Sequence, residues 1–115
     1  MKKNHLYIVF NICLFRYGLA CSMFKGEIWT AGGENNGVDL DVVEILTPFT
    51  NTWRTGPKLT RGRSYLTMEA LDNILVVFAG YGGSSSLEIL DVEEWREEPM
   101  QYEHYKHASV SIPCN

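Results

Sequence analysis

Apolar residues along this chain occur in short runs that are separated by residues typical of turns. Four such runs follow one another in the second half of the chain, and their composition predicts short β-strands. The run at 74–78 is apolar throughout, which predicts a strand that is buried on both faces. No stretch keeps a helical period, so the pattern predicts an all-β fold. The strands are expected at 64–71, 74–78, 86–90 and around Trp95.

The same pattern occurs twice, which indicates an internal repeat. The segment 16–33 aligns without a gap with the segment that begins 47 residues later, so that Arg16 falls on Arg63. Further along, Trp53 corresponds to Trp95 with a smaller offset, because the turn between the last two strands is shorter in the second copy. The first copy is therefore expected to form strands at 17–23, 27–31, 42–46 and 52–54.

Four strands in a unit of just under ~50 residues are typical of one blade of a β-propeller. We therefore predict an incomplete all-β propeller with about two four-stranded antiparallel blades. Its parts are expected to be a divergent N-terminal segment at 1–15, a first repeat at 16–62, a second at 63–106 and the start of a third at 107–115.

The motifs of both copies resemble the kelch repeat. That family has an Arg at the first strand, a glycine doublet after an apolar strand, a Glu in the third strand and a Trp after a turn. Two departures from the family pattern are Leu46 and Leu90, which stand where Tyr is usual. The motif residues are Arg16, Gly32-Gly33, Glu44 and Trp53 in the first copy, and Arg63, Ala79-Gly80, Glu88 and Trp95 in the second.

Structural roles follow for the glycines and tryptophans of these motifs. Gly32, Gly33 and Gly80 allow backbone angles closed to other residues and let neighbouring blades approach closely. Trp53 and Trp95 are expected to fill the space between blades, since a buried Trp contributes a large apolar area.

The resemblance also implies where a partner would bind. In BTB-kelch adaptors, partners dock on a face lined by the Arg-Ser that opens a strand and by the residue after the glycine doublet. Arg and Tyr are well suited to such a face, because they dominate interface hot spots. The corresponding positions here are Arg63, Ser64 and Tyr81 in the second copy and Arg16, Tyr17 and Glu34 in the first.

Arg63 has a second interpretation, in which it pairs with a neighbouring strand or loop carbonyl. The two roles make different predictions. If Arg63 contacts a partner, Arg63→Ala should weaken binding with little loss of stability. If Arg63 is structural, the same change should lower the melting temperature.

The function implied by the resemblance is a protein–protein interaction module in the cytoplasm, the substrate-recognition part of a cullin-class ubiquitin ligase adaptor. Its partner would be a protein, either a ubiquitination substrate or a cytoskeletal protein. A cullin would be reached only through a BTB region, which is absent from this sequence.

Charge and motif spacing argue against several other classes. The net charge of −4 and the lack of a basic stretch disfavour nucleic acid as a partner. The glycine-rich segment 79–83 is not followed by Lys-Ser or Lys-Thr, as a phosphate-binding loop would be. His104 and His107 would point to opposite faces of a strand, so they would not share a metal ion. We therefore expect no enzyme activity, no cofactor, no metal site and no membrane contact.

The cysteines and the N-terminus bear on the compartment. The sequence has an odd number of cysteines, Cys13, Cys21 and Cys114, and no Cys-x-x-Cys motif. This pattern fits free thiols in a reducing compartment. In the alternative interpretation, the chain is a secreted or membrane-linked kelch-repeat protein, because two lysines precede an apolar run at 6–15 as in a signal peptide. Cleavage after Ala20 would divide the strand predicted at 17–23, which favours the cytoplasmic interpretation.

Two blades leave a ring unclosed and apolar faces without a neighbouring blade. The 115-residue chain is therefore expected to aggregate, self-assemble or stay partly unfolded when it is expressed alone. Size-exclusion chromatography with hydrogen exchange measures this directly. A sharp monomer peak with strongly protected amides in both blades would contradict the expectation.

Overall fold

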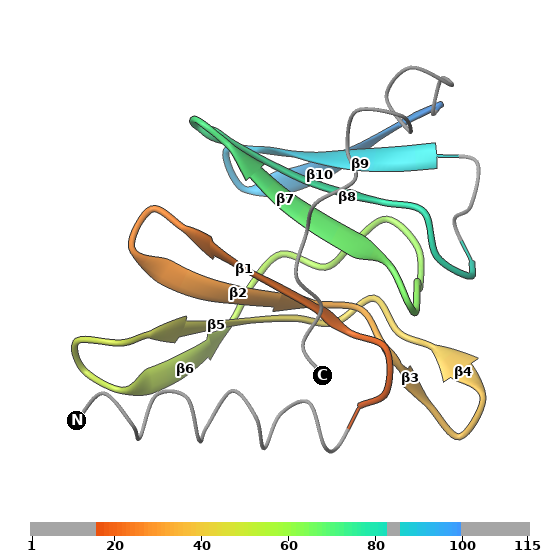
Figure 1. Cartoon of the computed structure of the whole chain (residues 1–115), viewed down its shortest axis with the longest axis horizontal. Helices are drawn as coiled ribbons and strands as arrows, with labels where there is room; N and C mark the ends of the chain where they lie inside the picture. The colour runs from red at the N-terminus through yellow and green to blue at the C-terminus, as the bar shows by residue number, and fades with distance from the viewer. Residues whose placement is uncertain (1–15, 83–85, 100–115) are drawn as a thin grey trace.

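The computed structural model describes residues 16–82 and 86–99, which form two four-stranded antiparallel sheets and a small hairpin (Figure 1). These described residues contain no helix, so the predicted all-β fold with two antiparallel four-stranded blades is confirmed. The first blade holds, side by side, β1 (Ala20–Phe24), β2 (Glu27–Ala31), β5 (Val43–Thr47) and β6 (Thr52–Thr55). The second holds, in the same arrangement, β7 (Thr67–Leu71), β8 (Ile74–Phe78), β9 (Ser86–Asp91) and β10 (Glu94–Pro99).

The first strand of each blade begins three residues later than the sequence predicts. Tyr17 and Ser64 do pair with another segment, but each forms only an isolated bridge outside the named strands. The ladder is interrupted because the next residue, Gly18 in one copy and Tyr65 in the other, has a positive φ of 68° and 55° respectively. Such left-handed residues turn the backbone out of an extended path.

A short hairpin, β3 (Glu34–Asn35) and β4 (Val38–Asp39), follows β2 and was not predicted. Its turn is Asn36-Gly37, and both residues have positive φ, 53° and 79°. Asn-Gly is the preferred pair for the two-residue turn that matches strand twist, so the sequence did carry the signal.

Strand register confirms the repeat alignment. Trp53 in β6 lies opposite Leu46 in β5, and Trp95 in β10 lies opposite Leu90 in β9. The two tryptophans therefore occupy equivalent positions, as predicted. The first strand of each blade, β1 and β7, is an edge strand, and these two strands lie next to each other.

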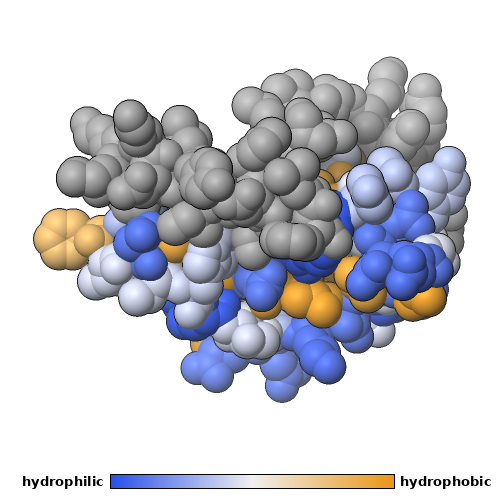
Figure 2. Space-filling model, turned by 90° about the horizontal axis from the view of Figure 1, so that it is seen from below, coloured by the Kyte–Doolittle hydropathy of each residue, from blue (hydrophilic) through white to orange (hydrophobic). Residues whose placement is uncertain are grey.

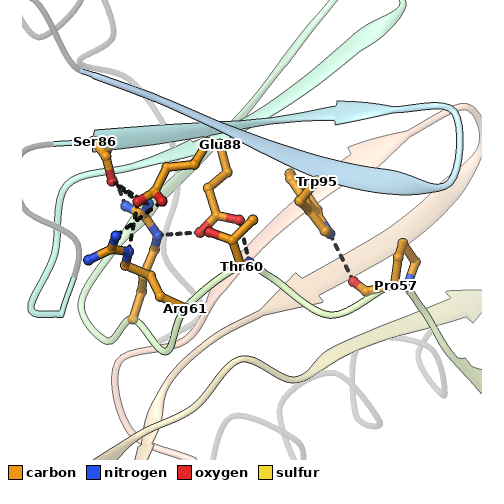
Figure 3. Close-up of polar contacts among 8 residues, drawn as sticks. Pro57, Thr60, Arg61, Ser86, Glu88 and Trp95 are labelled. Carbon is orange, nitrogen blue, oxygen red and sulfur yellow. Dashed lines mark hydrogen bonds and ion pairs between the residues drawn. The ribbon is translucent and has the colours of Figure 1, made fainter.

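The core lies between the two blades. One face of the first blade, with Trp29 and Ile45, packs against the face of the second blade that carries Val77 and Trp95. The indole Nε1 of Trp95 donates a hydrogen bond of 2.8 Å to the carbonyl oxygen of Pro57 in the segment between the blades (Figure 3). The two blades are held together by the packing of these apolar faces and by this hydrogen bond at the edge of the core.

The strand at 74–78 is buried on both faces only in part, whereas the sequence predicts full burial. Leu75 and Val77 are buried against the first blade. On the other face, Phe78 is also buried, Val76 is half-buried and Ile74 is exposed. In the view from the side of the first blade, the described surface is mostly hydrophilic, with separate hydrophobic groups (Figure 2).

Several predicted features lie outside the described residues. These are the segment 1–15, the start of a third repeat at 107–115, and both His104 and His107. Cys21 was expected to be a free thiol, but it is disulfide-bonded. Within the described part of the chain, no helix is long and apolar enough to cross a membrane.

The close approach of the blades at Gly32 yields a testable prediction. Gly32 and Gly26 have similar positive φ values, 74° and 79°, but a Cβ on Gly32 would lie 2.5 Å from the backbone oxygen of Arg63, whereas nothing lies within 4 Å at Gly26. Gly26→Ala is expected to lower the free energy of unfolding by about 1–2 kcal/mol through backbone strain alone. Gly32→Ala should cost about 1–3 kcal/mol more, measured by urea unfolding. If Gly26→Ala and Gly32→Ala lowered the free energy of unfolding equally, Gly32 would not be packed tightly against the Arg63 backbone.

Candidate partner-binding face

The predicted contact residues lie at the end of the blades where β2 leads to β5 and β8 leads to β9 (Figure 1). Tyr17 pairs with Glu34 through two backbone hydrogen bonds of 3.2 and 2.8 Å. Ser64 pairs with Tyr81 in the same way, at 3.1 and 2.8 Å. The structure therefore joins four of the six predicted residues in two equivalent pairs, one for each blade.

Further hydrogen bonds join the loops at this end of the first blade to those at the same end of the second blade. The amide of Tyr65 donates to the carbonyl of Gly18 at 2.6 Å, and the amide of Gly33 donates to the carbonyl of Arg63 at 2.7 Å. The hydroxyl of Ser64 donates to the Asp39 carboxylate at 2.7 Å. Ser64 is nearly fully buried, so it fixes the loops and offers little surface of its own. Loops tied at several points in this way form a preorganised surface.

Three tyrosines project from this end. Tyr17, Tyr65 and Tyr81 are 65%, 52% and 69% exposed. The rings of Tyr65 and Tyr81 meet edge to face with centroids 5.9 Å apart, an arrangement favoured between aromatic rings. We call these three residues the tyrosine face. Sequence reasoning missed Tyr65, although it directly follows the Arg63-Ser64 pair that carried the prediction.

Arg63 does not reach the tyrosine face. Its side chain is fully buried, and its Nε donates to the equally buried carboxylate of Glu88 at 2.8 Å. The guanidinium also donates to the carbonyl and the hydroxyl of Ser86, at 2.9 and 2.7 Å. The other carboxylate oxygen of Glu88 accepts a bond of 2.6 Å from the Thr60 amide (Figure 3). This geometry corresponds to the structural interpretation of Arg63.

Arg16 holds the equivalent place in the first blade. It lies 3.4 Å from the Glu44 carboxylate and donates to the hydroxyl of Thr30 at 3.1 Å. Burial lowers the pKa of the Arg16 guanidinium, and the nearby Glu44 opposes that shift. The first blade thus repeats the Arg–Glu pair of the second with less complete burial.

Glu97 extends the Arg63 cluster toward solvent. The Ser86 hydroxyl donates to it at 2.6 Å, and Arg61 pairs with it at 2.7 Å (Figure 3). The pKa of the Glu97 carboxyl lies below its ordinary value, chiefly because of the Ser86 hydrogen bond and further because of Arg61 and Arg63, with burial acting in the opposite direction. A depressed pKa means that this carboxylate stabilises the fold above its unfolded-state pKa and loses that contribution on acidification through its folded-state pKa.

Residues 16–60 match the family model of the kelch motif. The matched stretch contains every strand of the first blade and supports a kelch-repeat family. A kelch motif is typical of protein–protein interaction modules. The second blade repeats the strand order of the first and its Trp register.

A solved structure shares the fold. It is that of a novel fungal alcohol oxidase with catalytic diversity among the AA5 family, in complex with copper. The similarity has a TM-score of 0.62 at 15% identity, over 75% of this chain and 23% of the oxidase chain. At this identity the likeness shows the fold alone. In the present chain, the described residues contain no group of three or more His, Cys, Asp or Glu side chains that could hold a metal ion.

The burial of Arg63 predicts that its loss destabilises the fold. Arg63→Ala would leave the Glu88 carboxylate buried without its main cation, and breaking a buried pair in this way typically costs about 3–5 kcal/mol. Arg61→Ala is the matched control, because Arg61 is half-exposed and exposed ion pairs contribute only about 0–1 kcal/mol. Chemical denaturation followed by Trp fluorescence compares the two. If both variants unfold at the wild-type urea midpoint, the pair does not stabilise the fold.

Proposed function

We propose that this chain is a non-enzymatic protein-binding module and that the tyrosine face is its contact surface. One observation carries the proposal: Tyr17, Tyr65 and Tyr81 are all more than half exposed on loops that backbone hydrogen bonds fix in place. Tyr is enriched at binding hot spots because its ring contributes a large contact area while its hydroxyl makes a hydrogen bond.

The buried arginines take a different role in this proposal. Arg16 and Arg63 hold the loops from beneath through their Glu partners and do not touch the partner protein. Glu34, half-buried beside Tyr17, adds a carboxylate at the edge of the tyrosine face. We therefore expect a partner segment that offers apolar surface to the rings and a cation or hydrogen-bond donor to Glu34.

The more specific role that we propose is substrate recognition for a cullin-class ubiquitin ligase, in the cytoplasm. Its support is the resemblance of both copies to BTB-kelch adaptors, in which the Arg-Ser that opens a strand and the residue after the glycine doublet line the partner face. Of these positions, Tyr81 is exposed here, whereas Arg63 and Ser64 are buried. A captured partner should then be ubiquitinated in cells in a way that cullin inhibition prevents. Ubiquitination that is insensitive to cullin inhibition would contradict the adaptor role and leave the binding role intact.

A secreted kelch-repeat protein is the second candidate, and the disulfide at Cys21 favours it. Disulfides persist in oxidising compartments and are rare in the cytosol. Peptide mapping under non-reducing conditions, on protein alkylated in intact cells, separates the candidates. An alkylated Cys21 thiol would remove the support for secretion, whereas a disulfide-linked Cys21 peptide would remove the support for the cytoplasm.

A peptide-display selection against the purified chain tests the tyrosine face. Tyr81→Ala and Tyr65→Ala are expected to weaken binding of the selected peptides by about 30-fold or more, the usual loss at a hot spot. Phe49→Ala is the matched control, because Phe49 is 97% exposed in the β5–β6 turn at the opposite end of the first blade. Far-UV circular dichroism checks the fold of each variant. Peptides that lose affinity with Phe49→Ala and keep it with both tyrosine variants would refute the proposed surface.

A further inference from the structure

The ring of Tyr65 is held in a fixed position although much of it stays open to solvent. A Cβ on Gly18 would lie 2.9 Å from three atoms of this ring, so the ring covers the Gly18 backbone. Tyr81 meets the ring edge to face, with centroids 5.9 Å apart. Tyr65 is nevertheless 52% exposed. The face of an aromatic ring attracts cations, and a ring already held in place loses little freedom when a ligand binds to it.

The β3–β4 hairpin lies at the same end of the blades and brings negative charge to the tyrosine face (Figure 1). Its register places Glu34 directly opposite Asp39, so both side chains project from one face of the hairpin. Both residues are half-buried, and in the described part of the chain neither carboxylate forms an ion pair. Like charges directly opposite each other on paired strands are destabilising. A cation held between the two carboxylates would remove this repulsion.

Contacts link the two acidic residues to the tyrosines on either side of the hairpin. Glu34 forms the backbone bridge with Tyr17. The Asp39 carboxylate accepts the hydroxyl of Ser64 at 2.7 Å, and Ser64 directly precedes Tyr65 in the chain. The hairpin is thus joined to Tyr17 on one side and to the Tyr65 segment on the other.

The arginines near this end of the blades are engaged elsewhere. Arg16 and Arg63 are buried, each beside a glutamate of its own blade. Arg61 pairs with Glu97 at 2.7 Å. The charge that the described residues leave at the tyrosine face is therefore negative.

We propose that the tyrosine face binds an arginine side chain from a basic segment of the partner protein. This binding presupposes that the tyrosine face is the contact surface, as proposed above. The carboxylates of Glu34 and Asp39 accept the N–H groups of the guanidinium, and a tyrosine ring stacks on its plane. Arginine suits this site better than lysine, because its planar fork bonds carboxylates at two points and stacks on aromatic rings. An acidic segment would instead be repelled by the two carboxylates.

A synthetic peptide array tests the charge of the bound segment. Short peptides with mixed flanking residues and a fixed central Arg, Lys, Gln or Glu are probed with the purified chain and with its Tyr81→Ala variant. Central Arg is expected to give binding at least about 10-fold tighter than central Gln, with Lys between them and Glu weakest. Tyr81→Ala should weaken binding of the Arg peptides.

The array separates failure of the arginine site from failure of the tyrosine face. Binding that depends on Tyr81 but prefers Glu, or that ranks Arg no higher than Gln or Lys, would overturn the arginine site and leave the proposed surface intact. Binding that Tyr81→Ala leaves unchanged, or no binding to any peptide, would overturn both.

Two variants that remove one charge each locate the arginine on the chain. Glu34→Gln and Asp39→Asn should each weaken the tightest Arg peptide by about 10-fold. Neither should change the affinity of the same peptide with citrulline, an uncharged analogue of similar shape, in place of Arg. Glu93→Gln is the matched control, because Glu93 is exposed in the β9–β10 turn at the opposite end of the second blade. It removes the same charge and should leave the affinity unchanged.

Urea unfolding of Glu34→Gln distinguishes a binding role from a structural one. Removal of one of two opposed like charges should raise the urea midpoint or leave it unchanged, while the Arg peptide binds more weakly. A lower midpoint together with weaker binding would mean that Glu34 acts through the fold, and this would overturn the proposal. An equal loss of affinity with Glu93→Gln would also overturn it, because the effect would then come from the total charge of the chain.

Discussion

Both charged groups of the Arg63–Glu88 pair are fully removed from solvent, and a charge in that environment persists only beside a well-placed partner. Both residues of the pair also make hydrogen bonds to other segments of the chain. The carbonyl of Arg63 accepts a bond from Gly33 in the first blade, and its amide donates to Leu40, so one residue fixes the loops at the end of both blades. Glu88 in turn receives the Thr60 amide and thereby fixes the segment that joins the blades. The position of the second blade on the first depends on these bonds together with the apolar core.

The tyrosine face is a consequence of this arrangement. Tyr65 follows Arg63 and Ser64 directly, and its amide is bound to Gly18 of the first blade. Its left-handed backbone, with φ of 55°, is costly for a bulky residue and persists because the neighbouring bonds determine it. Strain of this kind often accompanies functional surfaces. Here it places the Tyr65 ring against Tyr81, next to the loop that follows the second glycine doublet.

Strand positions and the repeat were determined by the sequence itself. The strands at 27–31 and 74–78 have the predicted bounds, and the Trp53 and Trp95 positions are equivalent, because strand periodicity and turn residues are local properties. The β3–β4 hairpin was missed although Asn36-Gly37 signalled it, since a two-residue strand is too short to show a period.

The role of Arg63 could be decided only in three dimensions. The sequence placed Arg63 beside Ser64 and allowed both a partner contact and a structural pair. Its burial depends on Glu88 and Ser86, which are more than twenty positions away and reach Arg63 only after β8 and β9 pair. Tyr65 became a candidate for the same reason, because its exposure and its contact with Tyr81 arise from the packing of two blades. Local pattern fixes where the strands run, whereas burial and exposure are set by contacts between distant segments.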